Sequence, residues 1–125
     1  MSVAKKAIFI VGAKRTPFGA FGGSLKQISA IDLAVHSSKA ALAQAKLSPE
    51  KIDETIFGNV ISSSTDAAYL SRHIALKSGV PVAKPSLGIN RLCGSGFETV
   101  CLGAEAILLV RYQQTSSFTS IKWPY

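Results

Sequence analysis

Cys93 is the residue of this chain whose type and surroundings best suit covalent chemistry. It follows a strand-like segment at residues 85–89, and Gly94, Gly96 and an amphipathic segment come directly after it. This order predicts a sharp strand-to-helix turn, similar to the nucleophile elbow of hydrolases. The first N–H groups of a helix lack internal partners and carry partial positive charge, so they favour a thiolate over a thiol. The same groups could help to hold an oxyanion.

Other candidate groups are weaker. The sequence C-G-S-G is short, and free cysteines are often buried, so a structural role for Cys93 stays an alternative. Cys101 lies within a predicted helix on its apolar side, and we expect it in the core. His36 and His73 are expected at the surface or at a helix cap, because no spacing brings either of them to the thiol as a base. No C-x-x-C pair is present, and we expect no metal site.

Two further segments could suggest a cofactor loop. Residues 62–64 are serines that lack the glycines and the lysine of a phosphate-binding loop, so an ordinary polar turn is favoured. Residues 19–23 contain three glycines at a spacing that does not match a dinucleotide fingerprint. The residues that would bind a cofactor therefore stay unknown from the sequence.

Apolar periodicity predicts the elements that would position Cys93. They are, in order, a buried strand at 7–11, a helix from Ser29, a strand at 55–61, a helix from about Asp66, a strand at 85–89 and a helix after Gly96. This β-α-β-α-β-α order is typical of an α/β fold with a mainly parallel sheet.

Two of these predictions are specific enough to be checked residue by residue. Ser29 followed by Asp32 resembles a capping box. The last helix carries an apolar stripe that we expect to face the core: Phe97, Val100, Cys101, Ala104, Ile107 and Leu108. In the loop at residues 13–23, Phe18 and Phe21 are expected to pack against the rest of the protein.

Composition limits the class of protein. The 125 residues allow one domain, and a chain that is 47% hydrophobic and 17% charged is globular. The net charge is +7, but basic residues are scattered in runs no longer than two, which favours a solvated surface over a nucleic-acid site.

Two unpaired thiols suggest a reducing compartment. No apolar run approaches the ~20 residues of a membrane span. Residues 1–31 are basic and contain no acid, as in organelle transit peptides.

Three motifs, in this order, resemble the thiolase family. They are Lys14-Arg15-Thr16-Pro17-Phe18-Gly19, Gly58-Asn59-Val60 and Asn90-Arg91-Leu92-Cys93-Gly94-Ser95-Gly96. The likeness runs from about residue 7 to about residue 108 and is strongest to mitochondrial 3-ketoacyl-CoA thiolases, which are acetyl-CoA acyltransferases. It implies that residues 1–108 are an incomplete N-terminal half-domain of the thiolase fold, and that residues 109–125 are a divergent tail outside the family.

The resemblance also implies a reaction. The residue that matches Cys93 attacks the 3-keto carbonyl of a 3-ketoacyl-CoA, acetyl-CoA leaves, and a second CoA removes the shortened acyl chain from the sulfur, as in fatty-acid β-oxidation. Coenzyme A is then a co-substrate, and no tightly bound cofactor is expected. The family further implies a homo-oligomer, a dimer or tetramer, and a mitochondrial location, with peroxisomal or cytoplasmic locations as alternatives.

Family members are longer than this chain, and the resemblance implies that several functional groups lie in the part not present. They are the activating histidine, the second cysteine, the asparagine-containing oxyanion motif and the CoA-binding loop. We therefore expect a truncated form that is inactive by itself. The alternative is a non-catalytic interaction fragment that associates with a full-length thiolase. A third hypothesis, a basic nucleic-acid-binding domain, has no supporting motif.

Overall fold

The protein is a small α/β unit, described by a computed structural model over residues 7–109 and 116–117. Its elements are α1 (Ala30–Ala45), the 3-10 helix η1 (Pro49–Lys51), β1 (Thr55–Gly58), the 3-10 helix η2 (Ala67–Tyr69), α2 (Leu70–Lys77), β2 (Ser86–Ile89), α3 (Ser95–Leu108) and β3 (Ser116–Ser117). The predicted α/β class is confirmed. Within residues 7–109, no helix combines the length and apolar character needed to cross a membrane.

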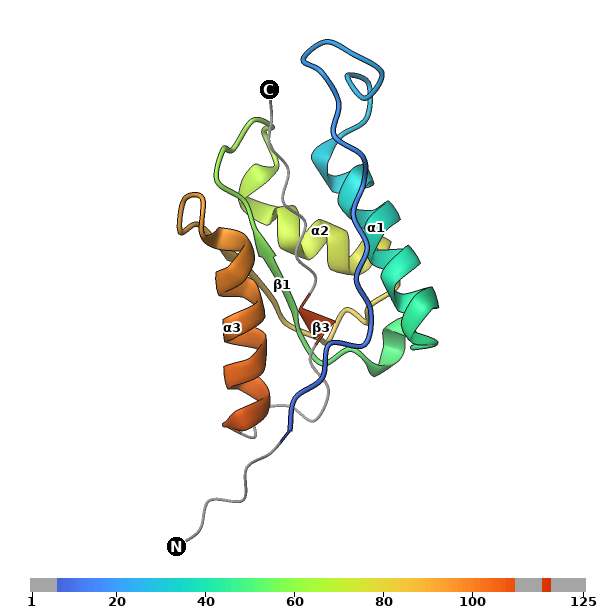
Figure 1. Ribbon diagram of the computed structural model, residues 1–125, viewed down its shortest axis with the longest axis vertical. Helices are drawn as coiled ribbons and strands as arrows, with labels where there is room; N and C mark the ends of the chain where they lie inside the picture. Colours follow the sequence, from blue (N-terminus) through green and yellow to red (C-terminus); the bar gives the residue numbers. More distant parts are fainter. Residues whose placement is uncertain (1–6, 110–115, 118–125) are drawn as a thin grey trace, which may run out of the picture.

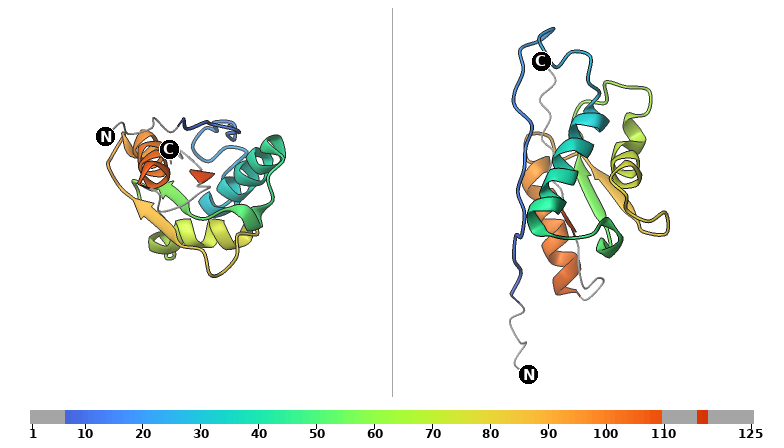
Figure 2. Two further views of the ribbon diagram at one scale, coloured as in Figure 1. Left: turned by 90° about the horizontal axis from the view of Figure 1, so that it is seen from below. Right: turned by 90° about the vertical axis from the view of Figure 1, so that its right-hand side faces the viewer.

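The sheet is parallel, and β1 is its central strand. β1 pairs with β2 over four residues, from Thr55 opposite Ser86 to Gly58 opposite Ile89, and with β3 over two residues. Figures 1 and 2 show α3 on one face of this sheet and α2 on the other, with α1 packed beside α2. The layers therefore place the start of α3 next to the carboxyl ends of β1 and β2.

The core lies between β1 and the pair of helices α1 and α2. Phe57 is fully buried there and meets apolar side chains of both helices, namely Ile31, Ala34, Leu70 and Ile74. A second cluster closes the other end of the same layer and contains Leu42, Ile52, Ala75 and Val80. Burying side chains of this size contributes about 1.5–3 kcal/mol each relative to leaving them exposed, so this layer is the main source of stability.

The start of α1 confirms the predicted capping signal. The backbone N–H of Asp32 donates to the Ser29 Oγ at 3.0 Å, and the Ser29 hydroxyl donates to the Asp32 carboxylate at 2.7 Å. Asp32 also pairs with Lys77 at the end of α2, with 3.0 Å between Nζ and Oδ1. One carboxylate therefore both serves the cap of α1 and links α1 to α2.

The predicted strand at residues 7–11 is wrong. This segment is extended and pairs with no strand among the described residues, and Phe9 and Ile10 are 78% and 79% exposed. It runs along α1 (Figure 1), where the Ala13 N–H donates to the Gln44 side-chain carbonyl at 3.1 Å. A strand needs a sheet edge, and β1 already has β2 on one side and β3 on the other. The observed order therefore starts with a helix rather than a strand.

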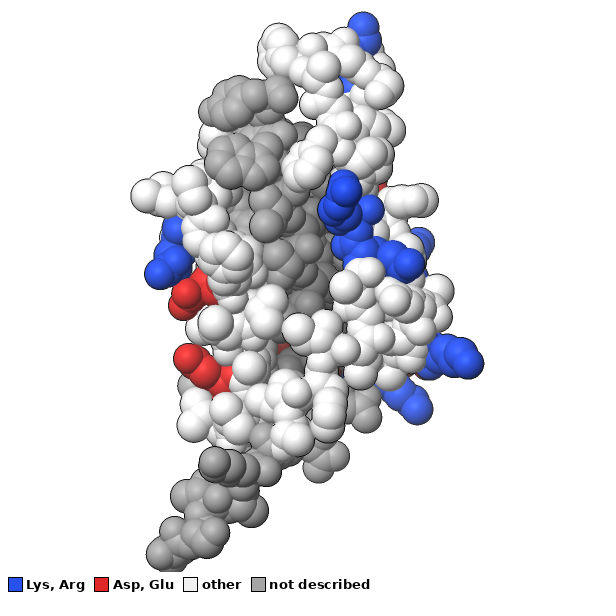
Figure 3. Space-filling view, viewed as in Figure 1, with Lys and Arg blue, Asp and Glu red and all other residues white. Residues whose placement is uncertain are grey.

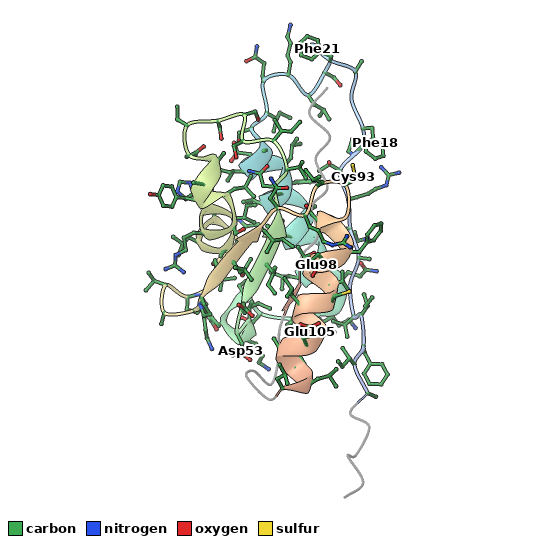
Figure 4. The ribbon with its side chains drawn as sticks, turned by 90° about the vertical axis from the view of Figure 1, so that its left-hand side faces the viewer. Phe18, Phe21, Asp53, Cys93, Glu98 and Glu105 are labelled. Atoms are coloured by element: carbon green, nitrogen blue, oxygen red, sulfur yellow. The ribbon has the colours of Figure 1, made fainter. Side chains whose placement is uncertain are left out.

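The aromatic residues of the following loop also differ from expectation. Phe18 and Phe21 are 73% and 88% exposed, so the prediction that they pack against the protein is wrong. Figure 4 shows Phe21 at the tip of this loop. The Arg15 guanidinium lies 5.3 Å from the centre of the Phe18 ring, which is a contact of the cation–π type within the loop itself.

The helix α3 forms where it was predicted, but it presents a different face to the sheet. Its buried positions are the small residues Ser95, Gly96, Thr99, Gly103 and Ala106. Most of the stripe expected in the core faces outward instead, with Phe97 at 71% and Leu108 at 51% exposure, while Ala104 and Ile107 are partly buried. Cys101 is exposed too, so its placement in the core is wrong. Periodicity identifies an apolar stripe but does not say which neighbour covers it.

We predict an acid-dependent loss of the contact between α1 and α2. The hydrogen bond from Ser29, and secondly Lys77, hold the pKa of Asp32 below its usual value of 3.8. A carboxyl group with a lowered pKa stabilises the fold above its unfolded-state pKa and loses this contribution as the pH falls through its folded-state pKa. The wild type should therefore be more stable than Asp32→Asn at neutral pH, and the difference should shrink below pH 3.8.

Urea unfolding followed by circular dichroism, at neutral pH and at a pH below 3.8, measures this difference in stability. Glu105→Gln removes a carboxylate from the exposed side of α3 and is the matched control. A difference between wild type and Asp32→Asn that is the same at both pH values would contradict the assignment.

Candidate active site

Cys93 lies in the turn between β2 and α3, at the carboxyl edge of the parallel sheet. Its side chain is exposed and unpaired with Cys101. Figure 4 shows it at the start of α3, with Glu98 and Glu105 farther along the helix. Ligands of open α/β sheets bind outside the carboxyl ends of the strands, so the position suits a reacting group. Whether Cys93 is the nucleophile stays a prediction at this point.

The turn itself is tight and internally hydrogen-bonded. Gly94 N–H donates to the Arg91 carbonyl at 3.2 Å, and Ser95 N–H donates to the Leu92 carbonyl at 3.0 Å. Leu92 adopts a φ of 50°, in the left-handed region that non-glycine residues rarely occupy. These two N–H groups are used within the turn, and the holding of an oxyanion by backbone N–H groups at this place stays a prediction.

The Gly58-Asn59-Val60 and Asn90–Gly96 motifs are far apart in sequence but adjacent in the structure. Asn59 N–H donates to the Ile89 carbonyl at 3.0 Å, which continues the pairing of β1 and β2 beyond the last strand residues. A Cβ added to Gly58 would lie only 2.8 Å from the Cβ of Ser95. Glycine at position 58 thus lets the start of α3, and with it Cys93, rest directly on the end of β1.

Charged groups near Cys93 come from the turn and from the first turns of α3. Arg91 pairs with Glu98, with 3.3 Å between Nε and Oε2. A Cβ at Gly94 would collide with the Arg91 Nη1, so the guanidinium folds across the residue after Cys93. Glycine at position 94 leaves the room for this arginine.

Neither histidine is placed as a partner of Cys93. His36 is exposed on α1. His73 on α2 faces Asp66, with 3.4 Å between Nδ1 and Oδ2, and its ring stacks on Tyr69 at 6.3 Å between centroids. A hydrogen bond from Ser64 holds the pKa of Asp66 below its usual value. No sequence pattern indicated this Asp66–His73 contact, because it joins a loop residue to a helix residue seven positions later.

A groove of about 300 Å³ lies away from Cys93, between residues 8–14, α1 and α3. Its walls are mostly apolar. They are lined by Leu42 of α1, Phe57 of β1, and Val100 and Ile107 of α3. Figure 3 shows most of the basic side chains of this face on the α1 side, and acidic side chains together with a basic one on the α3 side. Residues 7–109 and 116–117 contain no group of three His, Cys, Asp or Glu side chains that could hold a metal ion.

Known proteins are similar to this chain in sequence and in structure. The model of the thiolase N-terminal domain matches residues 8–115. The human mitochondrial 3-ketoacyl-CoA thiolase is 53% identical over 102 residues, which cover 82% of this chain and 26% of that protein. An acetyl-CoA acetyltransferase of Clostridioides difficile is 39% identical over 94 residues, which cover 75% of this chain and 87% of that protein.

A solved structure matches as well. The crystal structure of the human mitochondrial 3-ketoacyl-CoA thiolase in complex with CoA superposes with a TM-score of 0.81 at 52% identity. The match covers 83% of this chain and 26% of that one, so the chain spans about a quarter of the length of the human relative.

We predict that Gly58→Ala disturbs the packing of the start of α3 against β1. The new Cβ would lie 2.8 Å from the Ser95 Cβ and 3.2 Å from the Ser95 carbonyl carbon, so helix backbone must move. Overpacking of this kind costs about 1–3 kcal/mol of unfolding free energy. Gly88→Ala on β2 is the matched control, because the nearest atom to its new Cβ is the Ser71 hydroxyl at 3.3 Å.

Urea unfolding followed by circular dichroism compares the two variants with the wild type. Equal stability of Gly58→Ala and Gly88→Ala would show that the close approach of α3 to β1 is not a packing constraint.

Proposed function

Because this chain belongs to the thiolase family, we propose that it is the Cys93-bearing part of a 3-ketoacyl-CoA thiolase, an acetyl-CoA C-acyltransferase. The observation that carries the proposal is the exposed thiol of Cys93, in a strained turn that starts α3 at the carboxyl edge of the sheet. This is a position from which a sulfur can reach a substrate, whereas a structural cysteine would be covered.

In the proposed reaction, the Cys93 thiolate adds to the 3-keto carbonyl of a 3-ketoacyl-CoA. The bond between C2 and C3 then breaks, its electron pair stays on C2, and protonation of C2 releases acetyl-CoA. The acyl group stays on the sulfur as a thioester until the thiolate of a second CoA attacks it. The carbon–sulfur bond to Cys93 breaks in that step and the thiolate is regenerated.

The described residues supply the nucleophile but no group that moves these protons. His73 is held beside Asp66, and His36 lies on the exposed side of α1. Cys101 lies six residues after Ser95, the first residue of α3, which is about 9 Å of helical rise from the helix start and too far from Cys93 for a direct proton transfer. We therefore propose that the chain alone does not turn over, and that catalysis needs groups from the rest of a thiolase.

The same proposal covers the cellular setting. Coenzyme A is the co-substrate of the complete enzyme, in line with the human relative that was solved with CoA. We propose a mitochondrial location, because several mitochondrial 3-ketoacyl-CoA thiolases are about half identical to this chain. A homo-oligomeric complete enzyme that acts in fatty-acid β-oxidation is part of the same proposal.

A second candidate function is association with a full-length thiolase. The observation that favours it is the exposed apolar surface around the groove, formed by the outward stripe of α3 and by residues 9–11. Exposed apolar surface of this extent is typical of a face that another polypeptide covers. Such an association would make the chain a non-catalytic partner rather than an enzyme.

We predict a reactive but unproductive thiol. At neutral pH, iodoacetamide should modify Cys93 about tenfold faster than Cys101, because the Arg91 guanidinium folds across the residue next to Cys93, and exposed cysteines in electropositive surroundings are the reactive ones. Acetoacetyl-CoA and CoA should not be cleaved by the same preparation. Peptide mass spectrometry gives both alkylation rates in one chain, so Cys101 is an internal control for an exposed thiol. Equal rates would count against Cys93 as the nucleophile, and measurable cleavage would count against the inactivity of the chain.

We also predict that co-expression with a full-length mitochondrial 3-ketoacyl-CoA thiolase yields a complex on size exclusion. Phe97→Glu should weaken it at least about tenfold, because it places a charge in the apolar face that would be covered. Phe21→Glu is the matched control, since this phenylalanine is also solvent-exposed but lies at the loop tip. Absence of co-elution would argue against the second function without affecting the first.

A further inference from the structure

We propose that Asn90 is a positioning residue for Cys93. Its side-chain amide ties the strained turn in front of the thiol to the end of β1. The inference rests on the proposed function of Cys93 as the nucleophile and extends it to a residue that does not itself react.

The turn needs such support because of Leu92. Its φ of 50° is in the left-handed region, where the Cβ of an L-residue crowds the following carbonyl oxygen. Glycine and asparagine adopt this conformation readily, whereas leucine does so only when its surroundings hold it there. Leu92 directly precedes Cys93, so a rotation to negative φ would redirect the peptide that carries the thiol.

Asn90 contacts the turn and the strand layer with the two ends of one amide group. Its Oδ1 accepts from the Leu92 N–H at 3.0 Å, which fixes the strained residue locally. Its Nδ2 donates to the Val60 carbonyl at 3.1 Å, just beyond the end of β1. Since the amide is planar, both contacts hold only when the turn keeps one orientation relative to the sheet.

Ser95 supports the same turn from the helix side. Its hydroxyl accepts from the Arg91 N–H at 2.8 Å and donates to the Leu92 carbonyl at 2.7 Å. The N–H and the carbonyl of Leu92 are thus held by two different side chains, one tied to the strand layer and one part of α3. Ser95 is buried against Gly58, whereas Asn90 is exposed, so Asn90 can be replaced without filling or emptying the core.

The test measures the ratio of the iodoacetamide rates at Cys93 and Cys101 in the full chain. Asn90→Ala should lower this ratio several-fold, since a net hydrogen bond changes a local equilibrium by about that much. The double variant Asn90→Ala/Leu92→Gly should recover most of the ratio, because glycine adopts a positive φ without support. Asn59→Ala is the matched control: this amide donates to the Ala67 carbonyl at the same sheet edge without contacting the turn, and the ratio should not change.

Each outcome bears on the proposal. A high wild-type ratio that Asn90→Ala leaves unchanged overturns the positioning role alone. A lowered ratio that glycine at position 92 does not recover overturns it too, because the effect would then be a general loss of structure. A wild-type ratio near one overturns the proposed function and the positioning role together. Should Asn90→Ala fail to fold by circular dichroism, Asn90→Asp keeps the acceptor for the Leu92 N–H and should give an intermediate ratio.

Discussion

The structure depends on the close approach of α3 to β1 at Gly58. A side chain at this position would meet the first turn of the helix, with its Cβ 2.8 Å from that of Ser95. Without one, the helix start rests on the strand end, and only small residues fit along the rest of the contact. The same contact sets the position of the turn before α3 relative to the end of β1, and therefore the position of Cys93 at the sheet edge.

This approach also explains why so much apolar surface is left uncovered. A helix that turns its glycines, serine and threonine toward the sheet must turn its larger apolar residues away from it. Residues 9–11 add to this surface from the opposite wall of the groove. Exposed apolar surface of this extent is typical of a face that another polypeptide covers, in line with the proposed association with a full-length thiolase.

The sequence predicted what is determined locally. The cap at Ser29 and the turn-then-helix pattern around Cys93 follow from residue types within a few positions. The motif order also pointed to the thiolase family, which the comparisons confirm. The assignment of faces failed, because Cys101 and the strand at residues 7–11 depend on which segment occupies the neighbouring space. Two serines in β3, without any apolar alternation, carry no strand signal and yet occupy an edge of β1.

The proposed nucleophile and the groups that would move protons to and from it are specified in different ways. The surroundings of the proposed nucleophile are made locally, because the start of a helix, a residue with positive φ and two clamping side chains all lie within six positions of Cys93. A base or an acid must approach the sulfur from another direction, since the strand and the helix on either side of the turn lead away from it. Such a group has to come from a distant part of a longer chain or from a partner. In the proposed function, the Cys93 thiol is therefore reactive in this unit, while turnover belongs to a complete thiolase.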